Sequence, residues 1–164
     1  MAHASLRGRT KLSSREVTWS EAAKLVFGAF RNTSWSKNII GTTIRGWWPD
    51  SKMAAPTPRD LVRVAKTIMP RPWTEDFDCD DFALEYSYWA LAERIDGLTW
   101  CVGRAIFETT PSMATPHEMN VAVADVNGKL TLLVMEPQKC GDGAARHFLR
   151  KPGDGYVLRS CIFG

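Results

Sequence analysis

Residues 117–136 read HEMNVAVADVNGKLTLLVME and predict a β-hairpin, because two runs rich in valine and leucine flank Asn127-Gly128. Asn-Gly is a frequent two-residue hairpin turn, since both of its turn positions need a positive φ. Pairing around this turn brings the start of the first run opposite the end of the second. The hairpin therefore predicts that His117 and Glu136 lie beside each other on neighbouring strands.

The rest of the chain predicts helices first and further strands afterwards. Thr18 begins a segment with capping-box spacing, and Thr57 precedes a proline that suits the first position of a helix. A third helix begins at Asp78 or Cys79 and ends near Asp96-Gly97; it is expected to be buried, because apolar residues fall on several of its sides. Helices followed by antiparallel strands indicate an α+β fold. The strands are predicted at Leu98–Glu108, His117–Val126, Leu130–Glu136 and Tyr156–Phe163.

Length and composition predict one domain. The chain has 164 residues, of which 45% are apolar, and this is enough for a sizeable core. Residues 1–16 are expected to form a flexible basic arm, so the single domain spans residues 17–164. The net charge of +3 does not indicate a nucleic-acid partner, and it leaves the oligomeric state open.

The sequence gives no sign of a membrane or secretory segment. No apolar run reaches the roughly 18 residues that a spanning helix needs, and no hydrophobic segment follows the basic N-terminus. None of the four cysteines forms a CxxC pair, so neither a zinc site nor a disulfide framework is expected, although their even number leaves disulfides open. We therefore expect a cytoplasmic protein with reduced thiols.

Cys79 is the candidate nucleophile. A helix N-terminus and a nearby imidazole both lower the pKa of a thiol, and only the thiolate is strongly nucleophilic. His117 is the candidate base and acid, and Glu136 the group that orients it. The backbone N–H of Cys79 and the indole of Trp73 could bind an oxyanion, although packing explains Trp73 equally well. A small buried cysteine, a hydrogen-bonded histidine and a strand-end acid are the structural alternatives.

Acidic residues crowd Cys79 and oppose the thiolate. Five acids fall within residues 75–81, and negative charge that is not neutralised raises the pKa of a thiol. Carboxylate oxygens also suit Ca²⁺ or another divalent cation, so Asp80 and Asp81 could contribute to a metal site. Capping of the helix, with exposed acids around it, is the simpler interpretation, and nothing in the sequence requires a cofactor.

The segment Asp78-Cys79-Asp80-Asp81-Phe82-Ala83 resembles the nucleophile segment of transglutaminase-like cysteine proteinases of bacteria. It resembles even more the papain-fold cysteine protease domain of some fungal lectins, the agglutinin C-terminal domain. Members of that family use Cys, His and Glu in the order of Cys79, His117 and Glu136. The resemblance covers residues 57–138 and implies a papain-like fold, proteolysis and dependence on a divalent cation. It does not imply glycan binding, because no β-trefoil lectin domain is recognisable here.

Together these features predict a cysteine hydrolase, either a protease or an amidase, that forms an acyl-thioenzyme on a protein or peptide substrate. A transglutaminase-like acyltransferase would use the same three residues. A protein of another class remains the alternative: a non-catalytic binding protein or inhibitor on a papain-like scaffold, with a groove lined by tryptophans. Those tryptophans would be Trp47, Trp48 and Trp73.

Overall fold

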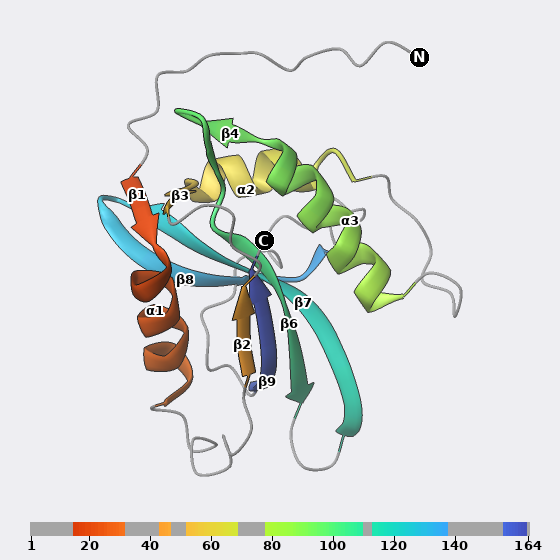
Figure 1. Cartoon of the computed structure of the whole chain (residues 1–164). Coiled ribbons are helices and arrows are strands. Elements are labelled where there is room, and N and C mark those ends of the chain that lie inside the picture. The colour runs from red at the N-terminus through yellow and green to blue at the C-terminus, as the bar shows by residue number, and fades with distance from the viewer. Residues whose placement is uncertain are drawn as a thin grey trace.

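The computed structural model describes most of the region from the first predicted helix to the last predicted strand. In the described residues it contains three helices and nine strands (Figure 1). No helix in the described part of the chain is long and apolar enough to cross a membrane. The described ranges are residues 15–31, 43–46, 52–68, 78–109, 113–137 and 156–163.

The three described helices all lie before residue 93, and the described elements that follow them are strands. The helices are α1 (Trp19–Arg31), α2 (Pro58–Ala65) and α3 (Cys79–Ala92). The strands are β1 (Arg15–Thr18), β2 (Thr43–Gly46), β3 (Lys52–Ala55), β4 (Arg94–Ile95), β5 (Leu98–Thr99), β6 (Val102–Thr109), β7 (Met113–Val126), β8 (Lys129–Met135) and β9 (Tyr156–Phe163).

A five-stranded sheet forms the centre of the fold, in the order β2-β9-β6-β7-β8. β6, β7, β8 and β9 pair antiparallel, whereas β2 pairs parallel with β9. The turn between β7 and β8 has φ values of 55° at Asn127 and 81° at Gly128, which confirms the predicted hairpin. Its register pairs Val126 with Lys129 and continues to Asn120 opposite Met135.

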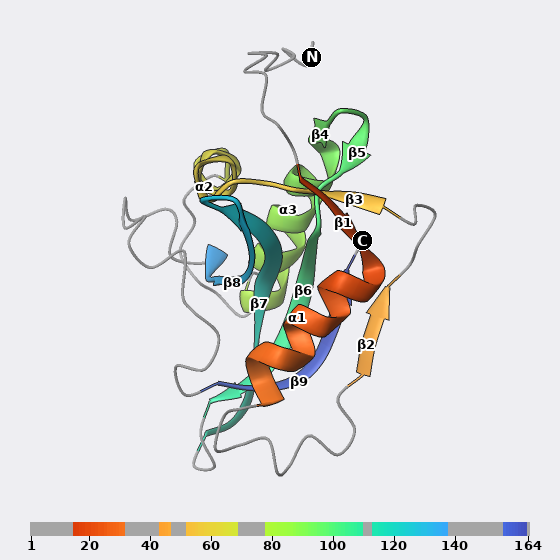
Figure 2. The same ribbon diagram turned by 90° about the vertical axis from the view of Figure 1, so that its left-hand side faces the viewer.

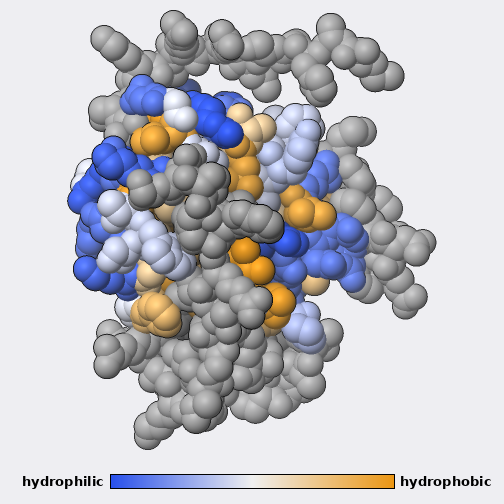
Figure 3. Space-filling model, in the orientation of Figure 1, coloured by the Kyte–Doolittle hydropathy of each residue, from blue (hydrophilic) through white to orange (hydrophobic). Residues whose placement is uncertain are grey.

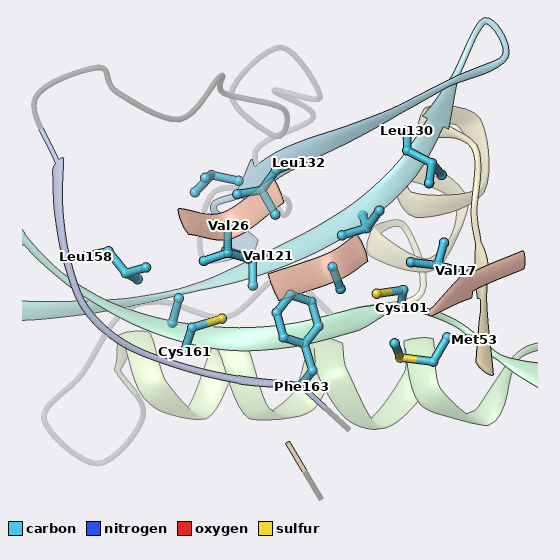
Figure 4. Close-up of a cluster of buried hydrophobic side chains, with 14 of the residues drawn as sticks. Val17, Val26, Met53, Cys101, Val121, Leu130, Leu132, Leu158, Cys161 and Phe163 are labelled. Carbon is cyan, nitrogen blue, oxygen red and sulfur yellow. The ribbon is translucent and has the colours of Figure 1, made fainter. Parts of the chain in front are cut away.

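Each face of this sheet carries a cluster of buried hydrophobic residues. α1 covers one face and α2 and α3 the other, so that the sheet lies between layers of helix (Figures 1 and 2). Alternation along β7 assigns Met119, Val121 and Val123 to the α1 side, and Ala122 and Ala124 to the other. Figure 4 shows the core on the α1 side, with α3 behind the sheet.

The first two helices begin at the residues that the sequence predicts. Thr18 donates its backbone N–H to Glu21 Oε2 at 2.9 Å, and Thr57 donates its own to Asp60 Oδ2 at 3.0 Å. In each case the threonine hydroxyl accepts the backbone N–H of the acid in return. These reciprocal bonds satisfy donors at the helix start that have no partner within the helix.

The predicted papain-like fold class is corrected by the structure. Strands outnumber helices three to one in the described residues, and the sheet is mixed rather than antiparallel. α3 is not a buried helix, because Leu84, Tyr88 and Trp89 are 52%, 67% and 37% exposed. Figure 3 shows hydrophobic patches among hydrophilic ones on the face of the molecule that includes α3. The described part of the chain has a β-rich fold, in which half-exposed helices pack on a mixed sheet.

Two small sheets were missed by the sequence analysis. β1 pairs with β3, and it begins at Arg15, within the segment predicted as an arm. β4 and β5 form a short hairpin at Asp96-Gly97, where the third helix was expected to end. Strands of two to four residues carry too little hydrophobic alternation to be recognised in a sequence.

Close packing between β6 and β9 gives a test of the fold. A Cβ atom added to Gly103 would lie 2.3 Å from the Ile162 carbonyl oxygen, so Gly103→Ala must push the two strands apart. We expect this substitution to lower the free energy of unfolding by about 1–3 kcal/mol or more, as measured by urea denaturation.

Gly28 in α1 provides the matched control. A Cβ atom there meets nothing within 4 Å, so Gly28→Ala should stabilise the protein by up to about 1 kcal/mol. Equal urea midpoints for Gly103→Ala and the unsubstituted protein would contradict the register of β6 against β9.

Candidate functional site

Cys79 is the first residue of α3, as the sequence predicts. Asp78 is the N-cap, and its Oδ1 accepts the backbone N–H of Asp80 at 3.2 Å. Asp81 Oδ2 in turn accepts the backbone N–H of Asp78 at 3.2 Å. The capping box fixes the first turn of the helix and therefore the origin of the Cys79 side chain.

The thiol of Cys79 lies against the backbone of β7. Its Sγ accepts a hydrogen bond from the Glu118 N–H at 3.5 Å. The pairing of β7 with β8 ends at Asn120 and Met135. Glu118 precedes Asn120 by two residues and so lies beyond this last pair. The thiol therefore meets the edge of β7 just beyond the end of its neighbour, next to the peptide bond that joins His117 to Glu118.

His117 and Glu136 are in contact, as the hairpin register predicts. His117 Nε2 and Glu136 Oε2 make a short hydrogen bond. The Glu136 side chain is 5% exposed and that of His117 is 24% exposed. Because Nε2 is engaged, Nδ1 is the ring nitrogen that could exchange a proton with a reacting group.

The structure does not join Cys79 to His117 directly. Within the described residues, no hydrogen bond links the thiol and the imidazole. Strand alternation explains this, because His117 is opposite Phe107 on the α1 side, whereas α3 covers the other face. The two side chains therefore start from opposite faces of the sheet, on either side of the Glu118 amide.

The surroundings of Cys79 favour the neutral thiol. Burial is the largest influence that raises its pKa, and the negative charges of Asp78, Asp80 and Glu136 raise it further. The hydrogen bond from the Glu118 N–H acts in the opposite direction and lowers the pKa. The net effect is a pKa above the ordinary value for cysteine, which bears out the opposition expected from the acidic cluster.

Two other cysteines are in the core and differ clearly from Cys79. Cys101 and Cys161 are fully buried, and burial raises the pKa of Cys101 to about 12 and that of Cys161 further still. Neither forms a disulfide. Among the described thiols, Cys79 alone is partly exposed.

The acidic cluster shares only Asp80 with the predicted metal site of Asp80 and Asp81. Potential ligand atoms of Asp78, Cys79 and Asp80 lie within 4.8 Å of one another, whereas Asp81 caps the helix. Asp80 is exposed, and its pKa is raised by its hydrogen bond with the Asp78 side chain. Binding of Ca²⁺ or another divalent cation here stays a prediction.

The positive charge of Arg104 lies close to Glu118 and Asp80. Arg104 on β6 forms an ion pair with Glu118 at 3.0 Å, and its charge also acts on Asp80. Burial raises the pKa of Glu118, while Arg104 lowers it. Arg104 thus offsets part of the negative charge around Cys79.

Some predicted residues lie outside the described ranges. They include the proposed oxyanion donor and the other tryptophans of the alternative groove. Nothing in the structure tests their roles. These residues are Trp47, Trp48 and Trp73.

Three polar residues of this region were not predicted from the sequence: Arg104, Glu118 and Asn120. Asn120 is fully buried and bonds to α3, on which Cys79 lies. A usable signal was present, because Asn120 interrupts the apolar run of residues 119–124, and a buried amide needs hydrogen-bond partners.

The fold is similar to part of a lectin chain. A complex named PSL1a-E64 gives a TM-score of 0.67 at 18% sequence identity, over 90% of this chain and 50% of that chain. A crystal structure of Polyporus squamosus lectin bound to the human-type influenza-binding epitope Neu5Aca2-6Galb1-4GlcNAc gives 0.62 at 18% identity, over 90% of this chain and 49% of that chain. This chain therefore spans about half the length of the solved chains that it resembles.

These comparisons correct the resemblance drawn from the sequence. No family model matches the chain. No curated protein sequence matches it. The similar solved structures are those of a lectin, so the chain is not assigned to a papain-fold cysteine protease family or to the transglutaminase-like proteinases. At this level of identity the likeness shows the fold alone.

The difference between the thiols can be measured by alkylation. We expect iodoacetamide to label Cys79 before Cys101 and Cys161 in the folded protein, with a pH midpoint above that of an unperturbed cysteine. Cys101 and Cys161 should react only after unfolding, because they are buried. Peptide mapping by mass spectrometry after labelling at a series of pH values would measure the order and the midpoint.

Asp80→Asn tests the electrostatic part of this prediction. Removing its charge should lower the pH midpoint of Cys79 labelling, whereas Glu16→Gln on β1 is the control and should leave it unchanged. Added Ca²⁺ should lower the midpoint in the same direction if the acids bind it. No response to Ca²⁺ or to chelation would rule out the predicted metal site, and no response to Asp80→Asn would contradict the electrostatic account.

Proposed function

We propose that the chain is a thiol-dependent hydrolase of peptide or amide bonds, with Cys79 as nucleophile, His117 as proton carrier and Glu136 as the group that orients His117. The observation that supports this most is the contact of His117 with Glu136 beside the amide that binds the Cys79 thiol. A nucleophile, a base and an acid that orients the base are the parts that acyl transfer needs.

The reaction would follow the usual course of acyl transfer. The Cys79 thiol loses its proton to His117 Nδ1 as Sγ attacks the substrate carbonyl carbon. The tetrahedral intermediate then breaks its carbon–nitrogen bond, and the imidazolium gives its proton to the leaving amine. Water, activated by His117, hydrolyses the thioester and restores the thiol. An amine in place of water would give acyl transfer instead.

The raised pKa of Cys79 affects how the thiol would attack the substrate carbonyl carbon. Its thiol is protonated at rest near neutral pH, so attack requires transfer of the proton to His117 in the same step rather than a preformed thiolate pair. Because the two side chains start from opposite faces of β7, His117 must turn around the strand edge toward Sγ.

A second candidate is a non-catalytic binding protein, and the comparisons favour it over the hydrolase. The similar solved structures are lectins, one of them bound to a sialylated trisaccharide. A thiol with a raised pKa and no hydrogen bond to His117 also suits a protein that performs no chemistry. In this case His117 and Glu136 would only stabilise the end of the sheet.

Acylation of Cys79 separates the two candidates without knowledge of the substrate. A hydrolase should release p-nitrophenolate from p-nitrophenyl acetate and carry a transient acetyl group on Cys79, visible by mass spectrometry after acid quenching. Cys79→Ser should abolish acylation, and His117→Ala should slow it by about a hundredfold or more. Glu136→Gln should slow it less, because it keeps an acceptor for the ring N–H.

Cys101→Ala is the matched control, since it removes a thiol that lies in the core. It should leave both the release of p-nitrophenolate and the acetylation of Cys79 unchanged. E64, an epoxide that alkylates thiolates, should modify Cys79 and prevent acylation. Equal acylation of the protein and its His117→Ala variant would rule out the proposed roles.

The binding candidate makes a prediction of its own. Titration calorimetry with Neu5Aca2-6Galb1-4GlcNAc should give a saturable heat that Cys79→Ser leaves unchanged, because a lectin does not use the thiol. Lactose serves as the control sugar without sialic acid. Saturable binding together with an inert Cys79 would replace the hydrolase by a glycan-binding protein; no heat at millimolar sugar would remove this glycan as a ligand.

A further inference from the structure

The turn between β7 and β8 can undergo a reaction of its own. An asparagine followed by a glycine deamidates when the glycine backbone nitrogen attacks the side-chain carbonyl carbon of the asparagine. A carbon–nitrogen bond forms, the side-chain amide nitrogen leaves as ammonia with the proton of the glycine N–H, and a succinimide ring results. Water then opens this ring to aspartate or isoaspartate. Asn127 and Gly128 are both exposed, so water has access to them.

The conformation of Asn127 opposes this attack. Its φ of 55° lies in the left-handed region, where ψ is about 47°. With such a ψ, the Gly128 nitrogen is turned to the side of the Asn127 Cα that is opposite to Cβ, so it cannot reach the side-chain carbonyl carbon. The turn must therefore open before the ring can form.

Asp125 holds the nitrogen that would attack. The Gly128 N–H donates to Asp125 Oδ1 at 2.6 Å, a short hydrogen bond to a charged acceptor. The attack needs this nitrogen to lose its proton, and a carboxylate beside it opposes the negative charge that would form there. The same bond keeps the N–H directed at Asp125 rather than at Asn127.

The small sheet of β1 and β3 holds this turn from outside. Arg15 Nη1 donates to the Gly128 carbonyl oxygen at 2.9 Å. The Asp125 N–H donates to the Pro56 carbonyl oxygen at 3.0 Å. Pro56 follows Ala55, which is the strand partner of Arg15. Both contacts thus come from one end of this sheet, which Figure 1 shows beside the turn.

We propose that Asn127 is a site of spontaneous conversion to aspartate and isoaspartate, and that Asp125 and the β1–β3 sheet keep this conversion slow in the folded protein. The rate then follows the fraction of molecules in which the turn is open. Isoaspartate carries the main chain through the side-chain carbon and lengthens it by a carbon atom, so the pairing of Val126 with Lys129 would weaken. The reaction involves neither Cys79 nor the proposed hydrolase activity.

Peptide mapping by mass spectrometry during incubation at neutral pH measures the deamidated fraction at Asn127. The folded protein is compared with the same protein in urea above its midpoint. We expect the folded protein to react at least about tenfold more slowly, because the turn is open in only a small fraction of molecules. Asp125→Ala should speed the reaction of the folded protein about tenfold and Arg15→Ala about threefold, since each removes a hydrogen bond that closes the turn.

Glu16→Ala is the matched control, because Glu16 is the neighbour of Arg15 on β1 but forms its ion pair with Lys52. It should leave the rate unchanged, and circular dichroism shows whether each variant is folded. Equal rates in the folded and the urea-unfolded protein would overturn the proposal. An unchanged or slower reaction in folded Asp125→Ala would also overturn it, and a slower one would make the carboxylate a base for the Gly128 N–H.

Asp125→Ser keeps the test decisive if Asp125→Ala does not fold. It retains a side-chain oxygen but removes the charge, so a faster reaction at Asn127 would support the proposal and an unchanged rate would overturn it. The converted protein, separated by ion exchange, should also have a lower urea midpoint than the unconverted protein. Equal midpoints would contradict the expected weakening of the hairpin.

Discussion

The register of β7 against β8 is the constraint on which the rest of the site depends. It is fixed by a turn in which Asn127 and Gly128 both adopt positive φ. A slip of one residue would move every side chain of β7 to the other face of the sheet. Each face carries a cluster of buried residues, so a slip would place Asn120 among the apolar residues of the α1 side and separate His117 from Glu136. The fold of the core and the composition of the site are therefore specified together.

One interaction at Cys79 favours the thiolate, and several oppose it. The Glu118 N–H stabilises the thiolate at one atom, whereas burial and three carboxylates oppose it. Their sum favours the neutral thiol, which protects a partly exposed cysteine from oxidation and alkylation at rest. A group that approaches with positive charge, or that accepts the proton as Sγ attacks, would change this balance. Arg104 is already paired with Glu118 and supplies only part of that charge.

The sequence was sufficient where a local rule determines the structure. The caps at Thr18, Thr57 and Asp78 and the hairpin at Asn127-Gly128 each follow from chemistry within four residues, and all were confirmed. The contact of His117 with Glu136 followed from the hairpin by counting.

What the sequence did not predict depends on contacts between distant segments. The parallel pairing of β2 with β9 joins residues more than 100 positions apart, and no local pattern reports it. The half-exposed face of α3 was mistaken for a buried one because apolar residues fall on several sides of this helix, and Leu84, Tyr88 and Trp89 are exposed all the same. The capping role of Asp81, which the sequence already offered beside a metal site, also follows from chemistry within a few residues, and the structure shows it. The papain-like assignment relied on a short segment around Cys79, and neither a family model nor the similar structures supported it.

The likeness to half of a lectin chain at 18% identity shows how little of this fold depends on particular side chains. A sheet covered on both faces needs apolar residues of suitable volume, and many combinations meet that need. Polar residues within such a core are more demanding, because each must find partners at fixed positions. Asn120 meets this demand only with α3, β6 and β7 in their present arrangement, and the same arrangement brings the Cys79 thiol to the Glu118 amide. The apolar core thus sets the architecture, while the hydrogen bonds of one buried amide restrict how α3 can lie against β6 and β7.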